Sequence, residues 1–504
     1  EYVVERVAAD IIRKIRTDAA EKLGIDRDRL TKAVITTPAY WEGDRKQAVV
    51  QAGEMAGFES IRTIKEPAAA AIAYGRFEPG LNKTIGVYDL GGGTFDFAVV
   101  DVDVKMDNTG SEYDVMAQSG DPELGGDDWD ARIVDWIVSQ FMKENGDVNP
   151  LNEHRTDSSP VESKIRKERI RDAARSAKEA LSNESRSRVN INIPFLMNIG
   201  GEPRDIDVEL SQVKFESLTE DLVEQTVNPI HTALDDAGLT VNDVDDVVLV
   251  GGSTRMPQIR EQVRAVFNKE PKHRVSPDEA VASGAAIKAN RDDILLLEVT
   301  PLSLGIAIKG GKFKRMIERN ERLPASETEV FKTASEGSTA VRIPIYQGER
   351  DIAKENRHLK TLVIEGMAPG SRNSAHIEVT FEVQQNGLIN VQAVESTRSK
   401  SVEVELEGEN RLPDEYVSEQ IEEARQKEEK DKKRQKIIDA QNDAQKSIEK
   451  AKKLISEFKQ VFDEEEMDNM KKHITNVKRT RKDDTATLGD LKQATEELDE
   501  WVLE

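Results

Sequence analysis

The sequence contains no cysteine among its 504 residues. This absence excludes disulfides, thiol nucleophiles and cysteine-ligated metal centres, and it is typical of a reducing compartment such as the cytoplasm. Histidine is scarce too: the six histidines are scattered without metal-ligand spacing, which favours ordinary surface or core positions. No run approaches about 18 uninterrupted apolar residues, so we expect neither a transmembrane helix nor a membrane partner.

Basic residues are fewer than acidic ones, so the formal net charge is -24. A protein of this charge is a poor candidate for binding nucleic acid through its phosphates. The hydrophobic fraction of 37% is enough for buried cores. The length suggests about three or four domains.

The first residues form an amphipathic pattern. The chain opens on Glu1 rather than Met, and Val3, Val7, Ile11 and Ile15 follow at four-residue steps. This spacing predicts a helix with one apolar face. A chain that opens inside a helix is interpreted as a fragment of a longer protein.

The hydrophobic pattern divides the chain into four parts. Residues 1–291 alternate strands and helices, which predicts an α/β domain. After a linker at 292–299, residues 300–408 carry short alternating strands and one strong hairpin signal, Asn386-Gly387, so an antiparallel sheet domain is expected. Residues 409–504 are charged and helical, typical of a small bundle. In the first part we expect strands at 32–37, 84–87, 97–102 and 247–250 and helices at 48–57 and 165–181; in the third part, strands at 303–308, 341–346, 376–383, 388–393 and 402–406.

The sharpest motif is the segment Asp89-Leu90-Gly91-Gly92-Gly93-Thr94-Phe95-Asp96 between two predicted strands. Glycines at such a turn let backbone N–H groups converge on an anion. The two aspartates could hold a hydrated divalent cation beside bound phosphates. A plain glycine-rich hairpin is the alternative.

Two further glycine pairs follow predicted strands. Gly251-Gly252-Ser253-Thr254-Arg255 could form the second half of a nucleotide cleft, with Arg255 lying on a base ring. Its alternative is a helix start capped by Ser253 or Thr254. Gly125-Gly126 beside acidic residues could contact a ligand or simply begin a helix.

Two other segments leave alternatives open. Glu66 precedes Pro67 and a run of alanines, so it could contact metal-bound water or act only as an acid at a helix start. The segment 294–297 places four large apolar residues between acids. It could be a buried strand or a switch that docks on the first domain in one state and leaves it in another.

Together these blocks resemble the phosphate, connecting and adenosine segments of the actin-like ATPase superfamily. Their sequences are similar to those of the seventy-kilodalton heat-shock family, the DnaK-type chaperones. The supporting segments are AVITTPAY at 33–40, EPAAAAIAYG at 66–75, PDEAVASGAA at 277–286, TPLSLGI at 300–306 and YQGER at 346–350. The resemblance implies an actin-like (ribonuclease H-like) ATPase domain at 1–291, a linker at 292–299, a β-sandwich peptide-binding domain at 300–408 and a helical lid at 409–504.

The resemblance also implies residue roles. ATP or ADP would bind with Mg²⁺ and K⁺ held by Asp89 and Asp96, which would also orient attacking water, and Glu66 would contact metal water. Thr94 would bind phosphate and be the site of autophosphorylation. The other nucleotide contacts would be Gly91, Gly92, Gly93, Gly125, Gly126, Lys178, Ser182, Gly251, Gly252, Ser253, Arg255 and Asp278. The peptide pocket would comprise Ile306, Lys309, Phe331, Ala334, Val341 and Ile343, and coupling would involve Pro38, Lys46, Leu295, Leu296 and Leu297.

Three positions depart from the family pattern. Arg175 stands where a ribose-contacting Glu is common, Lys46 where an Arg is usual, and Lys309 where the arch over the peptide often has a small residue or Met. In addition, the phosphate loop and catalytic Lys that open the family would precede Glu1. Because phosphoryl transfer needs charge stabilisation from all sides, we expect this chain to hydrolyse ATP little, whereas the intact parent would hydrolyse it.

The function implied is an ATP-dependent, stress-responsive chaperone that binds exposed apolar segments of unfolded or nascent polypeptides. Its implied partners are a J-domain cochaperone and a GrpE-like nucleotide-exchange factor, and it would be a mainly monomeric, cytoplasmic protein. One alternative is a peptide-binding module uncoupled from nucleotide, a holdase. A sugar or acetate kinase of the same superfamily would share the glycine turns but lack the sheet domain and lid.

Overall fold

The computed structural model describes most of the first four-fifths of the chain and parts of the rest. The described residues are 3–41, 44–76, 80–105, 110–152, 160–183, 185–272, 275–308, 310–332, 339–365, 376–385, 387–395, 400–406, 436–437, 440–441, 443–448, 450–452, 455, 464–482 and 486–503. The chain forms two compact units, Glu1–Arg411 and Leu412–Glu504. No described helix combines the length and apolar character that crossing a membrane requires.

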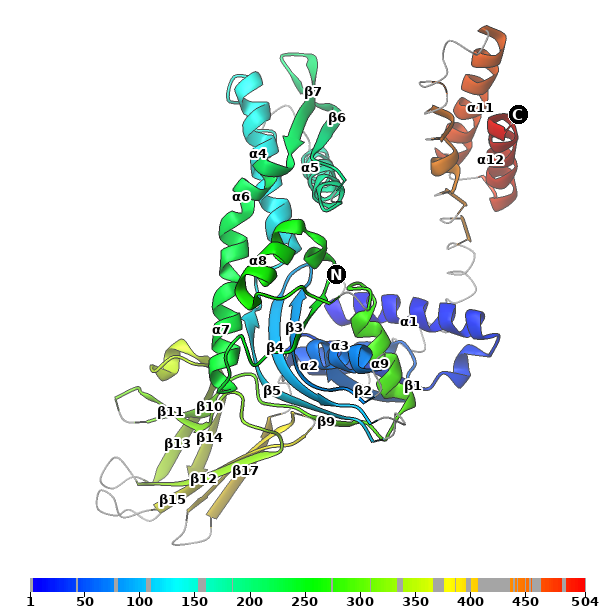
Figure 1. The fold of residues 1–504 in the computed structure, drawn as a ribbon. Helices are drawn as coiled ribbons and strands as arrows, with labels where there is room; N and C mark the ends of the chain where they lie inside the picture. The colour runs from blue at the N-terminus through cyan, green and yellow to red at the C-terminus, as the bar shows by residue number, and fades with distance from the viewer. Residues whose placement is uncertain are drawn as a thin grey trace. The chain divides into compact units, whose positions relative to one another are not determined.

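A five-stranded sheet forms the centre of the first unit (Figure 1). Its strand order is β8-β3-β4-β5-β9. The strands β3, β4 and β5 form an antiparallel meander, whereas β8 pairs in parallel with β3 and β9 in parallel with β5. The bounds are β3 Asn82–Leu90, β4 Phe95–Asp103, β5 Glu112–Asp121, β8 Asp246–Val250 and β9 Leu295–Leu297. The hairpin expected from 84–87 and 97–102 is confirmed.

Both faces of this sheet are buried, which explains why its strands carry apolar residues at successive positions. Tyr88 and Leu90 belong to one hydrophobic core, and Ile85 and Val87 on the same strand belong to another. Helices therefore cover each face.

One face packs against α3 (Glu66–Gly75) and α9 (Ala280–Asn290). These two helices approach closely because Gly284 has no side chain: a Cβ there would lie 1.7 Å from the carbonyl oxygen of Ala69. The same side of the unit carries the two-stranded parallel sheet of β1 (Lys32–Thr37) and β2 (Ser60–Lys65), with α1 (Val4–Leu23) and α2 (Asp44–Met55).

Helices and a hairpin that lie between β5 and β9 in sequence provide the second core. They are α4 Gly126–Glu144, α5 Pro160–Leu181, β6 Arg188–Ile199, β7 Glu202–Ser211, α6 Gln212–Gln225, α7 Val227–Asp236 and α8 Pro257–Phe267. The hairpin of β6 and β7 and the helices after it were not among the elements expected from the sequence.

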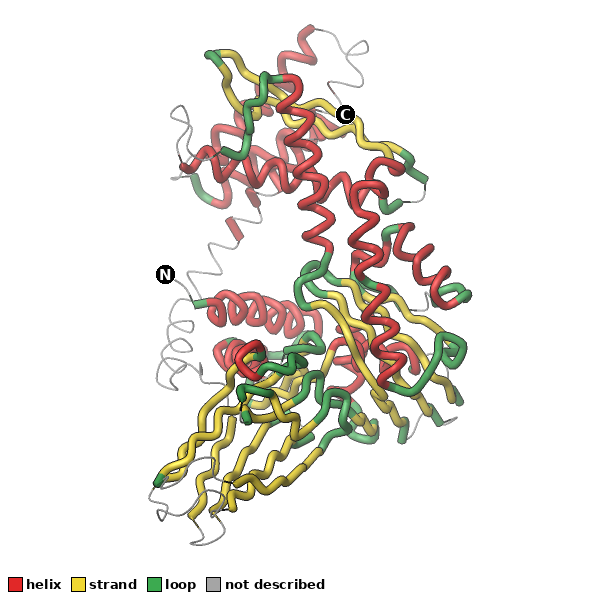
Figure 2. Tube along the Cα trace, turned by 90° about the vertical axis from the view of Figure 1, so that its left-hand side faces the viewer, coloured by secondary structure: helices red, strands yellow, loops and turns green. Residues whose placement is uncertain are grey.

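The rest of the first unit is two four-stranded antiparallel sheets that enclose one apolar core (Figure 2). Their orders are β11-β10-β13-β14 and β12-β15-β16-β17. The bounds are β10 Leu304–Ala307, β11 Phe313–Ile317, β12 Ala325–Lys332, β13 Ala340–Gln347, β14 Arg357–Glu365, β15 His376–Val383, β16 Ile389–Glu395 and β17 Lys400–Leu406. This arrangement is a β-sandwich, and all five strands expected here are present, with ends that differ by one or two residues.

In the second unit, α11 (Glu464–Lys482) and α12 (Leu488–Leu503) pack together. Their core also includes Ala444, Ile448 and Ala451, which lie in described helical residues before α11. The helical character expected for this part is present in its described residues, whereas residues 407–435 lie outside them.

Candidate functional site

The three glycine motifs converge at one end of the central sheet. The turn between β3 and β4 closes with a bond from the N–H of Gly91 to the carbonyl oxygen of Thr94, at 3.0 Å. The carbonyl oxygen of Gly91 accepts hydrogen bonds from the N–H of Gly126, at 3.0 Å, and from the hydroxyl of Ser253, at 2.9 Å. Three segments, the outermost 162 residues apart in the sequence, thus meet at one carbonyl oxygen.

Some glycines are required by contact between the loops. A Cβ at Gly125 would lie 2.4 Å from the oxygen of Gly92, and one at Gly251, whose φ is +86°, would lie 2.2 Å from the oxygen of Leu90. By contrast, Gly92 and Gly93 are exposed and have no atom within 4 Å of a Cβ position. Their open side is the place where backbone N–H groups can receive an anion.

Two carboxylates lie directly below this turn. Asp89 and Asp96 face each other across the β3–β4 pair, and both are buried. Burial raises the pKa of Asp89 well above its ordinary value, and the nearby charges of Glu66 and Asp96 raise it further. Burial likewise raises the pKa of Asp96 to about 7, helped by Glu66 and opposed by Lys65. The Glu66 pKa is raised by burial and lowered by Lys65.

These acids fit a hydrated Mg²⁺. One oxygen of Asp89, Oδ2, is buried and has no hydrogen-bond partner, which leaves an acceptor that a cation or its water can satisfy. Among the described residues no three His, Asp or Glu side chains form a metal cage. Mg²⁺ keeps most of its waters and is held by one or two carboxylates together with substrate phosphates.

Lys178 lies on the far side of the glycine turns. Its ammonium group donates to the carbonyl oxygen of Gly126 at 2.6 Å and pairs with buried Asp130 at 2.8 Å. Ser182, the residue directly after α5, donates its hydroxyl to the carbonyl oxygen of Lys178. The guanidinium group of Arg175 also lies near Asp130, at 3.4 Å from its carboxylate, and it lies 3.5 Å from the carboxylate of Asp127. It therefore shares with Lys178 the carboxylate that positions the lysine.

The second glycine turn is not a capped helix start. The residue before α8 is Met256, and neither Ser253 nor Thr254 caps that helix. Ser253 instead bonds Gly91, and Thr254 bonds the carbonyl oxygen of Gly251. Gly125, in contrast, is the N-cap of α4, so a helix start and contact with the cleft coexist there. Arg255 forms two bonds with Asp278, at 3.1 and 2.5 Å, at the exposed rim.

The segment 294–297 joins the central sheet. Leu295, Leu296 and Leu297 pair in parallel with Glu112, Tyr113 and Asp114 as the edge strand β9. The N–H of Leu295 donates to the carbonyl oxygen of Ser111 at 2.9 Å. Leu295 keeps 46% of its surface exposed, whereas Ile294 is buried. The segment is a strand, and it lies at the edge of the sheet. Its position is therefore compatible both with a structural strand and with a switch that leaves the sheet.

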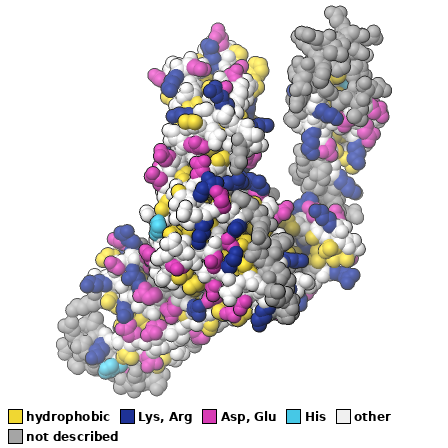
Figure 3. Space-filling view, in the orientation of Figure 1, with side chains coloured by type: hydrophobic (Ala, Val, Ile, Leu, Met, Phe, Trp, Pro, Cys, Tyr) yellow, Lys and Arg dark blue, Asp and Glu magenta, His cyan; other side chains and the backbone are white. Residues whose placement is uncertain are grey.

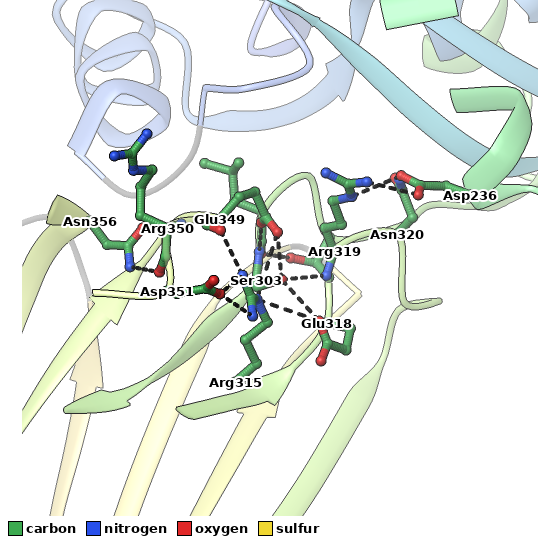
Figure 4. A network of polar contacts seen from close by, with 12 residues as sticks. Asp236, Ser303, Arg315, Glu318, Arg319, Asn320, Glu349, Arg350, Asp351 and Asn356 are labelled. Carbon is green, nitrogen blue, oxygen red and sulfur yellow. Dashed lines mark hydrogen bonds and ion pairs between the residues drawn. The ribbon is translucent and has the colours of Figure 1, made fainter. Parts of the chain in front are cut away.

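A polar turn between β11 and β12 also connects the sandwich to α7 and β5 (Figure 4). Arg319 reaches Asp236 at the end of α7 through two bonds of 2.9 Å, and the amide of Asn320 donates to the same carboxylate at 2.8 Å. Asn320 also exchanges hydrogen bonds with the backbone of Gln118. Sequence reasoning missed this contact, although the run of polar residues from Glu318 to Arg322 marks a turn.

Comparison with known proteins agrees with this geometry. The model of the family described as Hsp70 protein matches residues 1–504. Two curated relatives, each named chaperone protein DnaK and each from a strain of Halobacterium salinarum, are 42% identical over 453 residues, which cover 89% of this chain and 68% of the relative.

This chain belongs to the Hsp70 family. The membership identifies it as a DnaK-type molecular chaperone from a family that binds ATP or ADP with Mg²⁺. The structure brings together three of the segments that are expected to bind nucleotide in an Hsp70. They are the Gly91 turn, the Gly125 pair and the Gly251 turn.

Four of the residues expected to bind peptide in an Hsp70 lie in or against one hydrophobic core. Ile306 on β10 and Ile343 on β13 are buried in the sandwich core, whereas Phe331 and Val341 are half-buried at its margin. Lys309 and Ala334 lie outside the described residues. Of the expected coupling residues, Pro38 follows β1 and its carbonyl oxygen accepts from the N–H of Trp41, and Lys46 lies on α2.

Proposed function

We propose that this chain binds ATP or ADP with Mg²⁺ at the glycine turns and an extended apolar peptide in the sandwich, and that β9 and the turn at 318–322 couple the two. The observation that carries the proposal is the convergence of three glycine turns over the buried, incompletely bonded Asp89.

In the nucleotide cleft, the N–H groups of Gly92 and Gly93 and the hydroxyl of Thr94 would bind phosphate. Asp89 and Asp96 would hold Mg²⁺ through its waters, K⁺ would occupy the same acidic region, and Glu66 would orient metal water. Mg²⁺ supplies neutralisation of phosphate charge when bound. Thr94 is the proposed site of autophosphorylation because its hydroxyl borders the phosphate position.

The same residues suggest slow hydrolysis. Phosphoryl transfer needs positive charge on the transferred group from several sides. In the proposed phosphate site of the described chain, the direct donors are neutral N–H and hydroxyl groups. The charge of Lys65 acts on Asp96 and Glu66, and its ammonium group donates to the carbonyl oxygen of Trp41 at 2.7 Å. We therefore propose that this chain binds nucleotide more readily than it turns it over.

Coupling would run through contacts that bridge the two domains. Binding of nucleotide would alter the position of the Gly91 turn relative to β4 and β5, and β5 carries both β9 and the Gln118 contact of Asn320. Peptide would bind across the sandwich by backbone bonds and apolar pockets. Unfolded polypeptides, a J-domain cochaperone and a GrpE-like exchange factor are the proposed partners.

The test measures fluorescence anisotropy of a labelled apolar peptide before and after addition of Mg²⁺ and ATP. We expect the peptide to bind and ATP to accelerate its release, and Asp89→Asn to abolish the ATP effect while leaving peptide binding intact. Peptide binding that ignores ATP in the unaltered chain would favour the holdase alternative. No peptide binding at all would overturn the proposal.

A further inference from the structure

A second concave site lies between α4 and α6, on helices that form the core facing away from α3 and α9. It has a volume of about 410 Å³, in the range of ligand-binding clefts. One face of α4 and one turn of α6 line the site. The lining residues are Arg132, Asp135, Trp136, Ser139, Gln140 and Lys143 from α4, and Lys214 and Leu218 from α6. None of them belongs to the nucleotide or peptide sites described above.

Charge is segregated in this groove. The sequences of α4 and α6 contain nine acidic residues but only three basic ones, and all three basic residues, Arg132, Lys143 and Lys214, line the groove. Of the nine acids only Asp135 lines it. Acidic and basic side chains are interspersed over the face of the molecule drawn in Figure 3, and the chain as a whole carries -24. The groove is therefore a local basic site on an acidic protein.

The groove also offers an apolar floor. Trp136 and Leu218 are half-buried, packed against the core of the first unit with one side left toward the groove. Arg132 keeps 43% of its side chain exposed although it pairs with Asp221. A tryptophan flanked by basic groups can accept an apolar side chain while the rim attracts carboxylates.

The length of the site selects the class of ligand. Arg132 and Lys143 are eleven residues apart on α4, which places their backbones about 16 Å apart. This distance exceeds the reach of a small anion and equals about five residues of extended chain. We propose that the groove binds an acidic polypeptide segment of a partner protein, with a central large apolar side chain on Trp136 and carboxylates toward Arg132 at one end and Lys143 and Lys214 at the other.

The test uses the full chain and a fluorescein-labelled peptide, Asp-Glu-Ser-Phe-Leu-Ser-Glu-Asp, followed by anisotropy. A saturating unlabelled neutral apolar peptide occupies the sandwich, so that the second site alone is measured. We expect the double variant Lys143→Glu with Lys214→Glu to weaken binding at least tenfold, and Trp136→Ala at least fivefold. The matched control is Lys472→Glu with Lys478→Glu, two exposed lysines on α11 that give the same change in net charge.

A charge-swapped peptide, with lysine in place of each acid, separates loss of the site from loss of the fold. It should bind the Lys143→Glu, Lys214→Glu variant better than it binds the unaltered chain. Equal weakening by the groove variant and the α11 control would overturn the proposal, because it would show a response to net charge alone. Failure of the charge-swapped peptide to recover binding would also overturn it.

Discussion

Replacing Asp236 with alanine should loosen the contact between the sandwich and the central sheet. The carboxylate accepts one hydrogen bond from Arg319 and one from Asn320, and it forms a second ion-pair contact with Arg319. The side chains of Asp236 and Arg319 are 20% and 37% exposed. Hydrogen bonds to a charged group contribute about 1.5–3 kcal/mol when buried, and exposed ion pairs about 0.2–1 kcal/mol. For this partly exposed site we take about 1–2 kcal/mol.

That loss would raise the undocked population about 5- to 30-fold. The change can be followed by hydrogen exchange at the amide of Leu295, which is bonded to Ser111 at the sheet edge and would be released on undocking. In Asp236→Ala we expect this amide to exchange about 5- to 30-fold faster, whereas the amide of Val87, in the middle of the central sheet, should not change.

Asp235→Ala is the matched control, because Asp235 is an exposed neighbour on the same helix. It should leave the exchange of Leu295 unchanged. If Asp236→Ala and Asp235→Ala gave the same exchange at Leu295, the turn at 318–322 would not stabilise the position of β9, and the coupling route proposed above would lose its support.

Three further outcomes are expected at the nucleotide cleft. Because burial raises the pKa of Asp96 to about 7, the native state holds a proton there that the unfolded chain releases at a lower pH, so this group's contribution to stability falls as pH rises from about 4 to 7. The same proton opposes Mg²⁺, so calorimetry should show Mg²⁺ affinity rising at least about tenfold from pH 6 to pH 8. Asp96→Asn should weaken this dependence, and the part that is left should come from Asp89, whose pKa is raised as well. Arg175→Glu should tighten binding of a fluorescent ADP about fivefold or more, because the new carboxylate can accept a hydrogen bond from the ribose. Arg171→Glu, on the same helix, should leave the affinity unchanged. If the two variants bound ADP with equal affinity, residue 175 would not reach the nucleotide. Gly125→Ala should lower the unfolding midpoint in denaturant, because its Cβ would meet the backbone of Gly92. The control Gly92→Ala should leave the midpoint near that of the unaltered chain. An unchanged midpoint in Gly125→Ala would refute the close approach of the two loops.

Local chemistry in the sequence was sufficient to predict the central hairpin and the glycine turns. The strands β3 and β4 are long apolar runs that flank the turn at Gly91, and such a pattern predicts two adjoining buried strands. Antiparallel pairing then places Asp89 opposite Asp96 as a consequence of the short turn. The acid pair was therefore predictable from spacing, but its pKa shifts were not, because they arise from burial by distant helices.

The first helix confirms the periodicity of the sequence, but its apolar face lies outside the core. The helix expected from Val7, Ile11 and Ile15 is present, yet these side chains are 52–62% exposed. The residues of α1 buried in this unit include Arg16, whose guanidinium group bonds the carbonyl oxygens of Leu30 and Ala56. The pattern identified a helix but not the face that packs, since a charged side chain satisfied by backbone carbonyls replaces an apolar contact.

Contacts between distant segments lay beyond sequence reasoning for a different reason. Nothing in the four residues Ile294 to Leu297 specifies that β5 is their partner, because a short apolar strand can pair with any open sheet edge. The turn at 318–322 adds the missing information: Arg322 forms an ion pair with Asp114, the residue that β5 also pairs with Leu297. One short stretch of β5 thus contacts both β9 and the turn at 318–322. A displacement of β5 would act on both contacts at once, and this is the physical basis of the coupling proposed above.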